Sequence, residues 1–367
     1  MLRCVKMTAL VIGALAMTSP AYAAKRGSHG SNKRSPPPVT SPTPTPTPSP
    51  APISQSIVPS PANFPKFAAT SFWYTPLPAQ PPLDPNTANL NAEFMRQYQT
   101  YYGNVGVNTS AYSAPIYIAA AGAPTQQVTV IDCHNNGWID AGLVQQWAAV
   151  PIPSYAQPAD GTDEEMTVYQ PSTDILWEFW QMQKTATGGW QACWGGQMTN
   201  VSTNPGIWAH PYGASATGLP FFPGQVRVDE LESGSINHVI GIAIVDAENW
   251  DKFSWPANRS DGWNPLGLPN RIQEGQRFRI DPRIDIDRLS LNPIAAMVAK
   301  AGQKYGFVVW DKAGSLSLRF ENPKSLTLVA QPDPYGALFN GVPNYAILNG
   351  IPWSAIEFLP INYGSPG

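Results

Sequence analysis

The sequence has few charged residues and few residues that bind metals. Asp, Glu, Lys and Arg make up 13% of the chain, and the formal net charge is −3. There is no basic stripe of the kind that binds nucleic acid, and no polybasic patch that would bind a membrane surface. The four histidines show no metal-ligand spacing and no HExxH pattern, so the sequence indicates neither a metal site nor another cofactor.

Long apolar stretches are also lacking. The most apolar one, Thr8–Met17, has about ten residues, whereas a membrane anchor needs roughly twenty. It follows Arg3 and Lys6 and precedes Ala21-Tyr22-Ala23, a small-x-small pattern that signal peptidase cleaves. This arrangement predicts a secretory signal peptide over residues 1–23, and therefore a protein that is secreted or periplasmic.

Cysteine is scarce, and the mature chain would keep only Cys133 and Cys193. An even count in an oxidising compartment predicts one disulfide between them, and the alternative is two separate buried thiols. A bridge would close a loop of sixty residues and contribute about 2–4 kcal/mol to stability.

Proline is abundant in one segment. Twelve of the thirty residues from Pro36 to Pro65 are proline, a composition that cannot bury apolar surface. We expect residues 24–65 to form a disordered Pro-rich linker, and residues 66–367 to form one β-rich globular domain.

Short β-type segments separated by Gly and Pro turns dominate the remainder. Apolar residues at spacings of three and four predict helices over Asn89–Tyr102 and Asn292–Tyr305. The pattern favours a mainly β fold, a single sandwich-like or jelly-roll-like domain with a few peripheral helices. The expected strands are Gln127–Cys133, Met166–Gln170, Ile175–Gln181, Trp190–Trp194, Asn237–Val245, Arg277–Ile280, Phe307–Trp310 and Ser315–Phe320.

A predicted hairpin carries the first candidate catalytic residues. Met166–Gln170 and Ile175–Gln181 are placed to pair across a tight turn, and their alternation puts Glu178 and Trp180 on one face. Asp163 precedes the hairpin within an acidic cluster. Two such carboxylates beside an aromatic ring could act as the acid and base of a glycosidase. The alternative is a solvated surface carboxylate.

His238 is a third candidate catalytic residue. It begins an apolar strand pattern, and a histidine with a tyrosine such as Tyr212 could act in a polysaccharide lyase. Arg259 could then neutralise the carboxylate of a uronate. The alternative for His238 is a buried structural histidine.

Aromatic residues cluster in the same region. Five of the thirteen tryptophans fall between residues 177 and 208. Some must belong to the core, and others could form a face on which sugar rings stack. The predicted substrate contacts are Trp180, Trp177, Trp194, Tyr212 and Arg259.

About half of the chain, from Gly161 to Phe320, resembles a group of uncharacterised secreted bacterial proteins common in actinobacteria. The resemblance rests on motifs that include Trp177-Glu178-Phe179-Trp180, Trp194-Gly195-Gly196 and Ile236-Asn237-His238. It implies one exported domain and no particular activity.

Taken together, the residues predict a secreted carbohydrate-active protein that acts on a polysaccharide or a cell-envelope glycan. The leading interpretation is a polysaccharide-degrading enzyme, a glycoside hydrolase or else a lyase, with an Asp/Glu pair in a Trp-lined groove. The alternatives are a non-catalytic, lectin-like glycan-binding module and an envelope structural protein.

Overall fold

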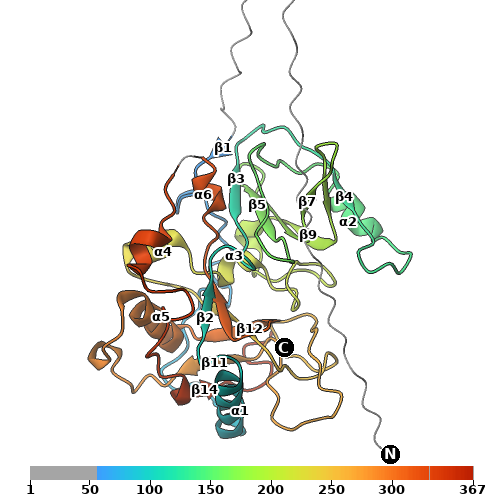
Figure 1. The fold of residues 1–367 in the computed structure, drawn as a ribbon. Helices are drawn as coiled ribbons and strands as arrows, with labels where there is room; N and C mark the ends of the chain where they lie inside the picture. The colour runs from blue at the N-terminus through green and yellow to red at the C-terminus, as the bar shows by residue number, and fades with distance from the viewer. Residues whose placement is uncertain (1–55, 330, 367) are drawn as a thin grey trace, which may run out of the picture. The chain divides into compact units, whose positions relative to one another are not determined.

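Short strands and mostly short helices form the regular structure, which a computed structural model describes for residues 56–329 and 331–366 (Figure 1). The predicted signal peptide and most of the predicted Pro-rich linker, residues 1–55, lie outside the described residues. The described residues belong to one compact unit. Within them, no helix combines the length and the apolar character needed to cross a membrane.

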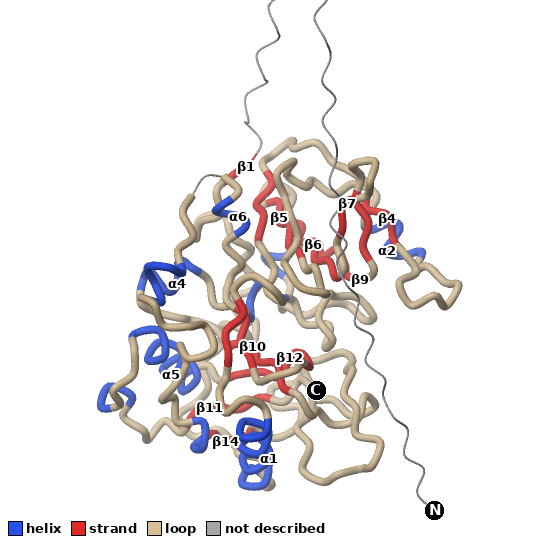
Figure 2. Tube along the Cα trace, viewed as in Figure 1, coloured by secondary structure: helices blue, strands red, loops and turns tan. Residues whose placement is uncertain are grey.

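The strands form three sheets, which Figure 2 shows in red. The first has the order β1 (Ser56–Ile57), β3 (Ile116–Ala119), β5 (Met166–Gln170), β6 (Ile175–Trp180), β9 (Trp194–Thr199). The second has the order β14 (Ile356–Phe358), β11 (Arg277–Ile280), β12 (Phe307–Lys312), β10 (Ile240–Ile244), β13 (Ser317–Arg319), β2 (Gly106–Asn108). The third is β4 (Val128–Val130), β8 (Trp190–Ala192), β7 (Gln183–Lys184).

The prediction of a mainly β fold is confirmed, but the sandwich or jelly roll is not. Each sheet contains at least one parallel pair, such as β10 with β12 and β3 with β5. A jelly roll is built from antiparallel strands in two sheets. The described fold is therefore better stated as three mixed sheets with few helices.

Two helices are long, α1 (Thr87–Thr100) and α5 (Pro293–Lys304), and both lie where the sequence predicts them. In α5, Pro293 occupies the first turn and the side chain of Asn292 accepts a hydrogen bond from the backbone N–H of Ala295. The short helices are α2 (Ala141–Gln146), α3 (Phe221–Gly224), α4 (Val228–Ser233), α6 (Lys324–Thr327) and α7 (Tyr335–Phe339).

The predicted hairpin is present, and all of β5 pairs antiparallel with residues 175–179 of β6. Its alternation is also as predicted. Trp177 and Phe179 belong to an apolar cluster on one face, whereas Leu176 belongs to another cluster on the opposite face. This sheet is thus covered on both sides, which decides how deep its side chains lie.

The folded part begins before Lys66. β1 pairs with β3, and the side chain of Phe64 is only 8% exposed and packs against Phe222. The described end of the Pro-rich segment therefore belongs to the fold.

The predicted pairing of the two cysteines is confirmed. Cys133 and Cys193 lie at disulfide distance, with their Cα atoms 5.6 Å apart. The bridge joins the loop after β4 to the residue before β9. It therefore fixes His134, the next residue, beside the pocket described below.

Candidate functional site

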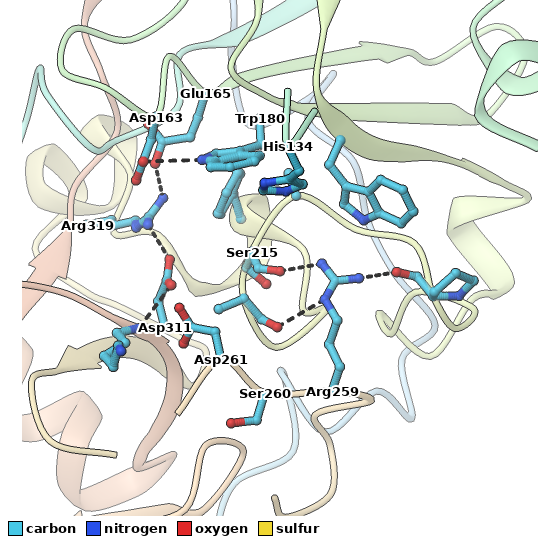
Figure 3. A pocket seen from close by; sticks show the side chains of 16 residues that line it. His134, Asp163, Glu165, Trp180, Ser215, Arg259, Ser260, Asp261, Asp311 and Arg319 are labelled. Carbon is cyan, nitrogen blue, oxygen red and sulfur yellow. Dashed lines mark hydrogen bonds and ion pairs between the residues drawn. The ribbon is translucent and has the colours of Figure 1, made fainter. Parts of the chain in front are cut away.

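A pocket of about 510 Å³ opens between the two larger sheets (Figure 3). The first sheet contributes Trp180, at the end of β6, and Trp194, at the start of β9. The second contributes Asp311 from β12 and Arg319 from β13. These four residues belong to strands of both sheets, so the packing of the core fixes their positions in the pocket wall.

The two tryptophans line the pocket together because they are direct partners in the antiparallel pair of β6 and β9. Partners across such a pair project from the same face of the sheet. The indole N–H of Trp180 donates to the carboxylate of Asp163 over 3.2 Å, and the ring of His134 stacks on Trp180 at 6.1 Å. Asp163, Trp180 and Trp194 thus line one pocket together.

Arg319 is the centre of the pocket's charge. Its guanidinium donates to Glu165 and to Asp311, each over 2.5 Å, and we call these three residues the Arg319 cluster. The guanidinium lies over the rings of Phe221 and Trp310, at 4.6 and 5.5 Å from their centroids. Arg319 and Glu165 are 5% and 0% exposed, whereas the side chain of Asp311 is 15% exposed toward the pocket.

Two carboxylates that share one guanidinium cannot both ionise easily in a buried place. Burial raises the pKa of Asp311 to about 7; Arg319 opposes the rise, and the charges of Asp261, Asp163 and Glu165 add to it. Burial also raises the pKa of Glu165, again against Arg319. The cluster therefore tends to hold a proton at neutral pH.

One oxygen of this cluster has no partner among the described residues. Glu165 is 0% exposed, and its Oε1 accepts from Arg319, but its Oε2 is buried without a hydrogen bond. A buried carboxylate oxygen without a donor costs free energy, on the order of 1–3 kcal/mol. Because Glu165 lines the pocket, a bound molecule is the natural source of the missing donor.

A further acid stands at the pocket's other wall. Asp261 is exposed in the loop between β10 and β11, and its backbone N–H donates to the side chain of Glu274 over 3.0 Å. Burial and the charge of Asp261 raise the pKa of Glu274 to about 8. In Figure 3 the carboxylates of Asp261 and Asp311 lie side by side.

Arg259 lines the pocket, but its hydrogen-bond donors are all used. Its Nε, Nη1 and Nη2 donate to the backbone carbonyls of Pro211, Tyr212, Gly213, Ser215 and Ala216. A guanidinium has five N–H donors, so none is left for a substrate. Burial lowers the pKa of Arg259 to about 10. The structure gives Arg259 the role of holding a loop, in place of the predicted substrate contact.

Glu178 does not reach the pocket. Its side chain is 0% exposed, and its two carboxylate oxygens accept the backbone N–H groups of Phe221 and Phe222 over 2.9 and 3.1 Å. Burial raises its pKa to about 7, although these N–H groups act in the opposite direction. A carboxylate so enclosed holds the start of α3, which corrects the catalytic role expected for it.

His238 lies in a different cavity from Asp163. It is 2% exposed, and its ring nitrogens contact the carbonyl of Val239 at 2.8 Å and Glu230 at 3.0 Å. Arg227 contacts Glu230 at 2.9 Å and Asp229 at 3.1 Å. We call Arg227, Asp229, Glu230 and His238 the Arg227 cluster. The three predicted catalytic residues therefore do not share a groove.

The last two predicted contacts also divide. Trp177 is 2% exposed in the core, and its indole N–H donates to the carbonyl of Gln146. Tyr212 stacks on Trp194 at 6.4 Å behind the pocket wall, and its hydroxyl donates to Asp140 over 3.4 Å. These two residues support the pocket and do not line it.

Sequence reasoning missed Asp311, Arg319 and Asp261 as site residues. One signal is present, because Arg319 is the one charged residue in the expected strand Ser315–Phe320. A charge in such a place requires a buried partner. The partner could not be read from the sequence, since Glu165 lies 154 residues away.

Comparisons with known proteins add no assignment to this geometry. The chain matches no protein-family model, and no curated protein or solved structure shows significant similarity to it.

Proposed function

We propose that the protein is a secreted carbohydrate-active enzyme, a glycoside hydrolase that works in the pocket around Arg319. The observation that carries the proposal is an acid whose pKa is raised to about 7, Asp311, in a pocket that holds a second carboxylate and two tryptophan rings. Glycoside hydrolysis needs one carboxyl group that donates a proton and another that accepts one.

In this mechanism Asp311 donates its proton to the glycosidic oxygen as the bond from that oxygen to the anomeric carbon breaks. Water adds to the anomeric carbon and loses a proton to Asp163. The carboxylate of Asp163 also accepts a hydrogen bond from the indole N–H of Trp180. Asp311 thus loses one proton and Asp163 gains one, so the number of protons on the two acids is unchanged over one turnover. Trp180 and Trp194 offer ring faces on which a sugar can stack.

A lyase is less well supported by the same pocket. A lyase must neutralise the carboxylate of a uronate with a cation, but the donors of Arg259 are occupied and Arg319 is engaged by two carboxylates. A lectin-like module is the second candidate, because the paired rings of Trp180 and Trp194 could bind a sugar without chemistry.

Release of reducing ends from a panel of polysaccharides tests the proposal. We expect Asp311→Asn to lower kcat by about 10²–10⁴-fold. Asp251→Asn, an exposed aspartate in the same loop as Asp261, is the matched control and should keep full activity. The rate should fall as the pH rises above about 7, because Asp311 then loses its proton.

Three results would reject the hydrolase: no release from any polysaccharide, full activity in Asp311→Asn, or release of unsaturated uronates. The lectin reading predicts that Trp180→Ala abolishes glycan binding while Asp311→Asn binds as the parent protein does.

A further inference from the structure

We infer that the sugar bound in this pocket carries a protonated amine, so that the substrate class is a polymer of hexosamine units whose amino groups are free. The inference rests on the proposed function, since it names a substrate for the same pocket. It is argued from the hydrogen-bonding state of each charged group that lines the pocket.

The first observation is the hydrogen bonding of the Glu165 carboxylate. Glu165 lines the pocket, and its Oε2 is buried with no hydrogen-bond partner among the described residues. Neutral hydroxyl groups and ammonium groups can both donate to it. An ammonium group brings three donors and a positive charge, and its hydrogen bonds to a carboxylate are about twice as strong as neutral ones.

The second argument is the balance of available charge. Four carboxylates line the pocket, those of Asp163, Glu165, Asp261 and Asp311. Both arginines are already engaged, one by backbone carbonyls and the other by two carboxylates. Among the described lining residues, this leaves Lys312 as the one cation whose side chain has no ion pair or hydrogen bond. An anionic sugar would meet four carboxylates and one available cation here, whereas a cationic sugar would meet carboxylates that can pair with it.

The third argument is the aromatic wall. The rings of Trp180 and Trp194 border the same hollow as these acids. Tryptophan is the best ring for holding a cation over its face, and it also stacks on the apolar face of a sugar. A ring with carboxylates around it therefore suits a sugar that has both an apolar face and an ammonium group.

Binding of a cation would also change the protonation of the pocket. Asp311 faces Arg319, Asp261, Asp163 and Glu165, and the three acids among these raise its pKa. An ammonium group would offset that repulsion and favour ionised carboxylates. Protons should then leave the Arg319 cluster when the amine enters, whereas a neutral sugar would release none.

Titration calorimetry with three disaccharides tests the inference, using the β-1,4-linked dimers of glucosamine, N-acetylglucosamine and glucose. At about pH 6 the amine is charged, because amines of this kind have pKa values near 8. We expect the glucosamine dimer to bind about tenfold more tightly or better. Repeating the titration in buffers of different ionisation enthalpy should reveal proton release with this dimer alone.

Two variants locate the effect. Glu165→Gln removes the charge and should reduce the preference for the amine to about threefold or less, as should Asp261→Asn, which changes an exposed residue. Glu232→Gln, an exposed glutamate on α4, is the control and should leave all three affinities unchanged.

Equal or weaker binding of the glucosamine dimer overturns the inference, and so does an absence of binding by all three sugars. A preference for the amine that survives in both variants overturns it as well. If the preference and its loss are observed but no polymer is cleaved, the hydrolase proposal falls and the assignment of the pocket to an amino sugar stands.

Discussion

The molecule contains two arginines in nearly the same setting, and they differ in how their carboxylates are satisfied. Arg319 and Arg227 each lie between aromatic rings, and each is shared by two carboxylates. In the Arg227 cluster, Glu230 accepts from Arg227, from the backbone N–H of Arg227 and from His238, so neither oxygen is free. In the Arg319 cluster, Glu165 has one oxygen, Oε2, for which residues 56–329 and 331–366 provide no hydrogen-bond donor.

The pKa values of the two glutamates follow this difference. Burial opposes ionisation of Glu230, but His238 and Arg227 outweigh it and lower its pKa. For Glu165 burial prevails and raises the pKa, as it also does for Asp311 and for Asp229 of the Arg227 cluster. A buried carboxylate whose hydrogen bonds are complete stabilises the fold. One whose hydrogen bonds are incomplete can still bind a ligand or exchange a proton. The two glutamates therefore differ both in hydrogen bonding and in pKa, although each pairs with a buried arginine.

Replacing each arginine should reveal the difference between the two clusters most strongly. Arg319→Met leaves Glu165 and Asp311 buried without a cation and should cost about 3–5 kcal/mol of unfolding free energy near neutral pH. Arg227→Met should cost less, about 1–3 kcal/mol, because His238 still pairs with Glu230 and Asp229 is partly exposed. Urea unfolding of both variants measures the difference.

The loss in Arg319→Met should shrink at about pH 5, since protonated carboxyls no longer need a cation. Equal losses for the two arginines, or a loss in Arg319→Met that does not depend on pH, would show that the clusters do not differ as described.

Glu178 should affect both clusters at once. It binds the backbone N–H groups of Phe221 and Phe222, whose rings lie under Arg319 and Arg227 respectively. Glu178→Ala leaves two buried donors without acceptors and should cost about 1–3 kcal/mol. Glu178→Gln keeps one acceptor oxygen and should cost less. Thermal unfolding of the two variants orders them, and the reverse order would contradict this role.

The smallest effect concerns the pH dependence of stability. The pKa of Asp311 is higher in the folded state than its ordinary value of 3.8, so its contribution is present at low pH and is lost as the pH rises through about 7. Asp311→Asn should therefore lose less unfolding free energy than the parent between about pH 5 and pH 8, by about 1 kcal/mol or more.

Glu230 supplies the opposite case. Its pKa is lower in the folded state than the ordinary 4.5, so its contribution is lost as the pH falls below that value. Glu230→Gln should flatten the acid side of the stability curve and leave the alkaline side as in the parent. Denaturant titrations across pH compare the two variants; a change on the same side in both would refute the contrast.

The sequence predicts what depends on neighbouring residues. The alternation in β5 and β6, the capping of α5 and the opposite faces of Trp177 and Leu176 are local patterns, and they are present. The burial of a side chain is not a local property, because it depends on which elements cover the sheet. Glu178 was placed on the correct face, yet α3, more than forty residues later, covers it.

The candidate site was predicted only in part, for the same reason. Trp180, Trp194 and Asp163 lie near one another through the pairing of β6 with β9 and through the segment before β5. Asp311 and Arg319 come from the other sheet. Their contact with the first half of the site depends on tertiary packing, which no local periodicity encodes.

The way in which Arg259 holds residues 211–216 bears on how this pocket could change in evolution. Arg259 recognises the loop through backbone carbonyls, which every residue type has. Side chains along the loop could therefore be exchanged while its path stays the same, provided that Arg259 remains. A lysine could not replace it, because an ammonium has three donors where the loop presents five acceptors. One invariant arginine would then permit a variable wall, and proteins with this frame could differ in the molecules that the pocket binds.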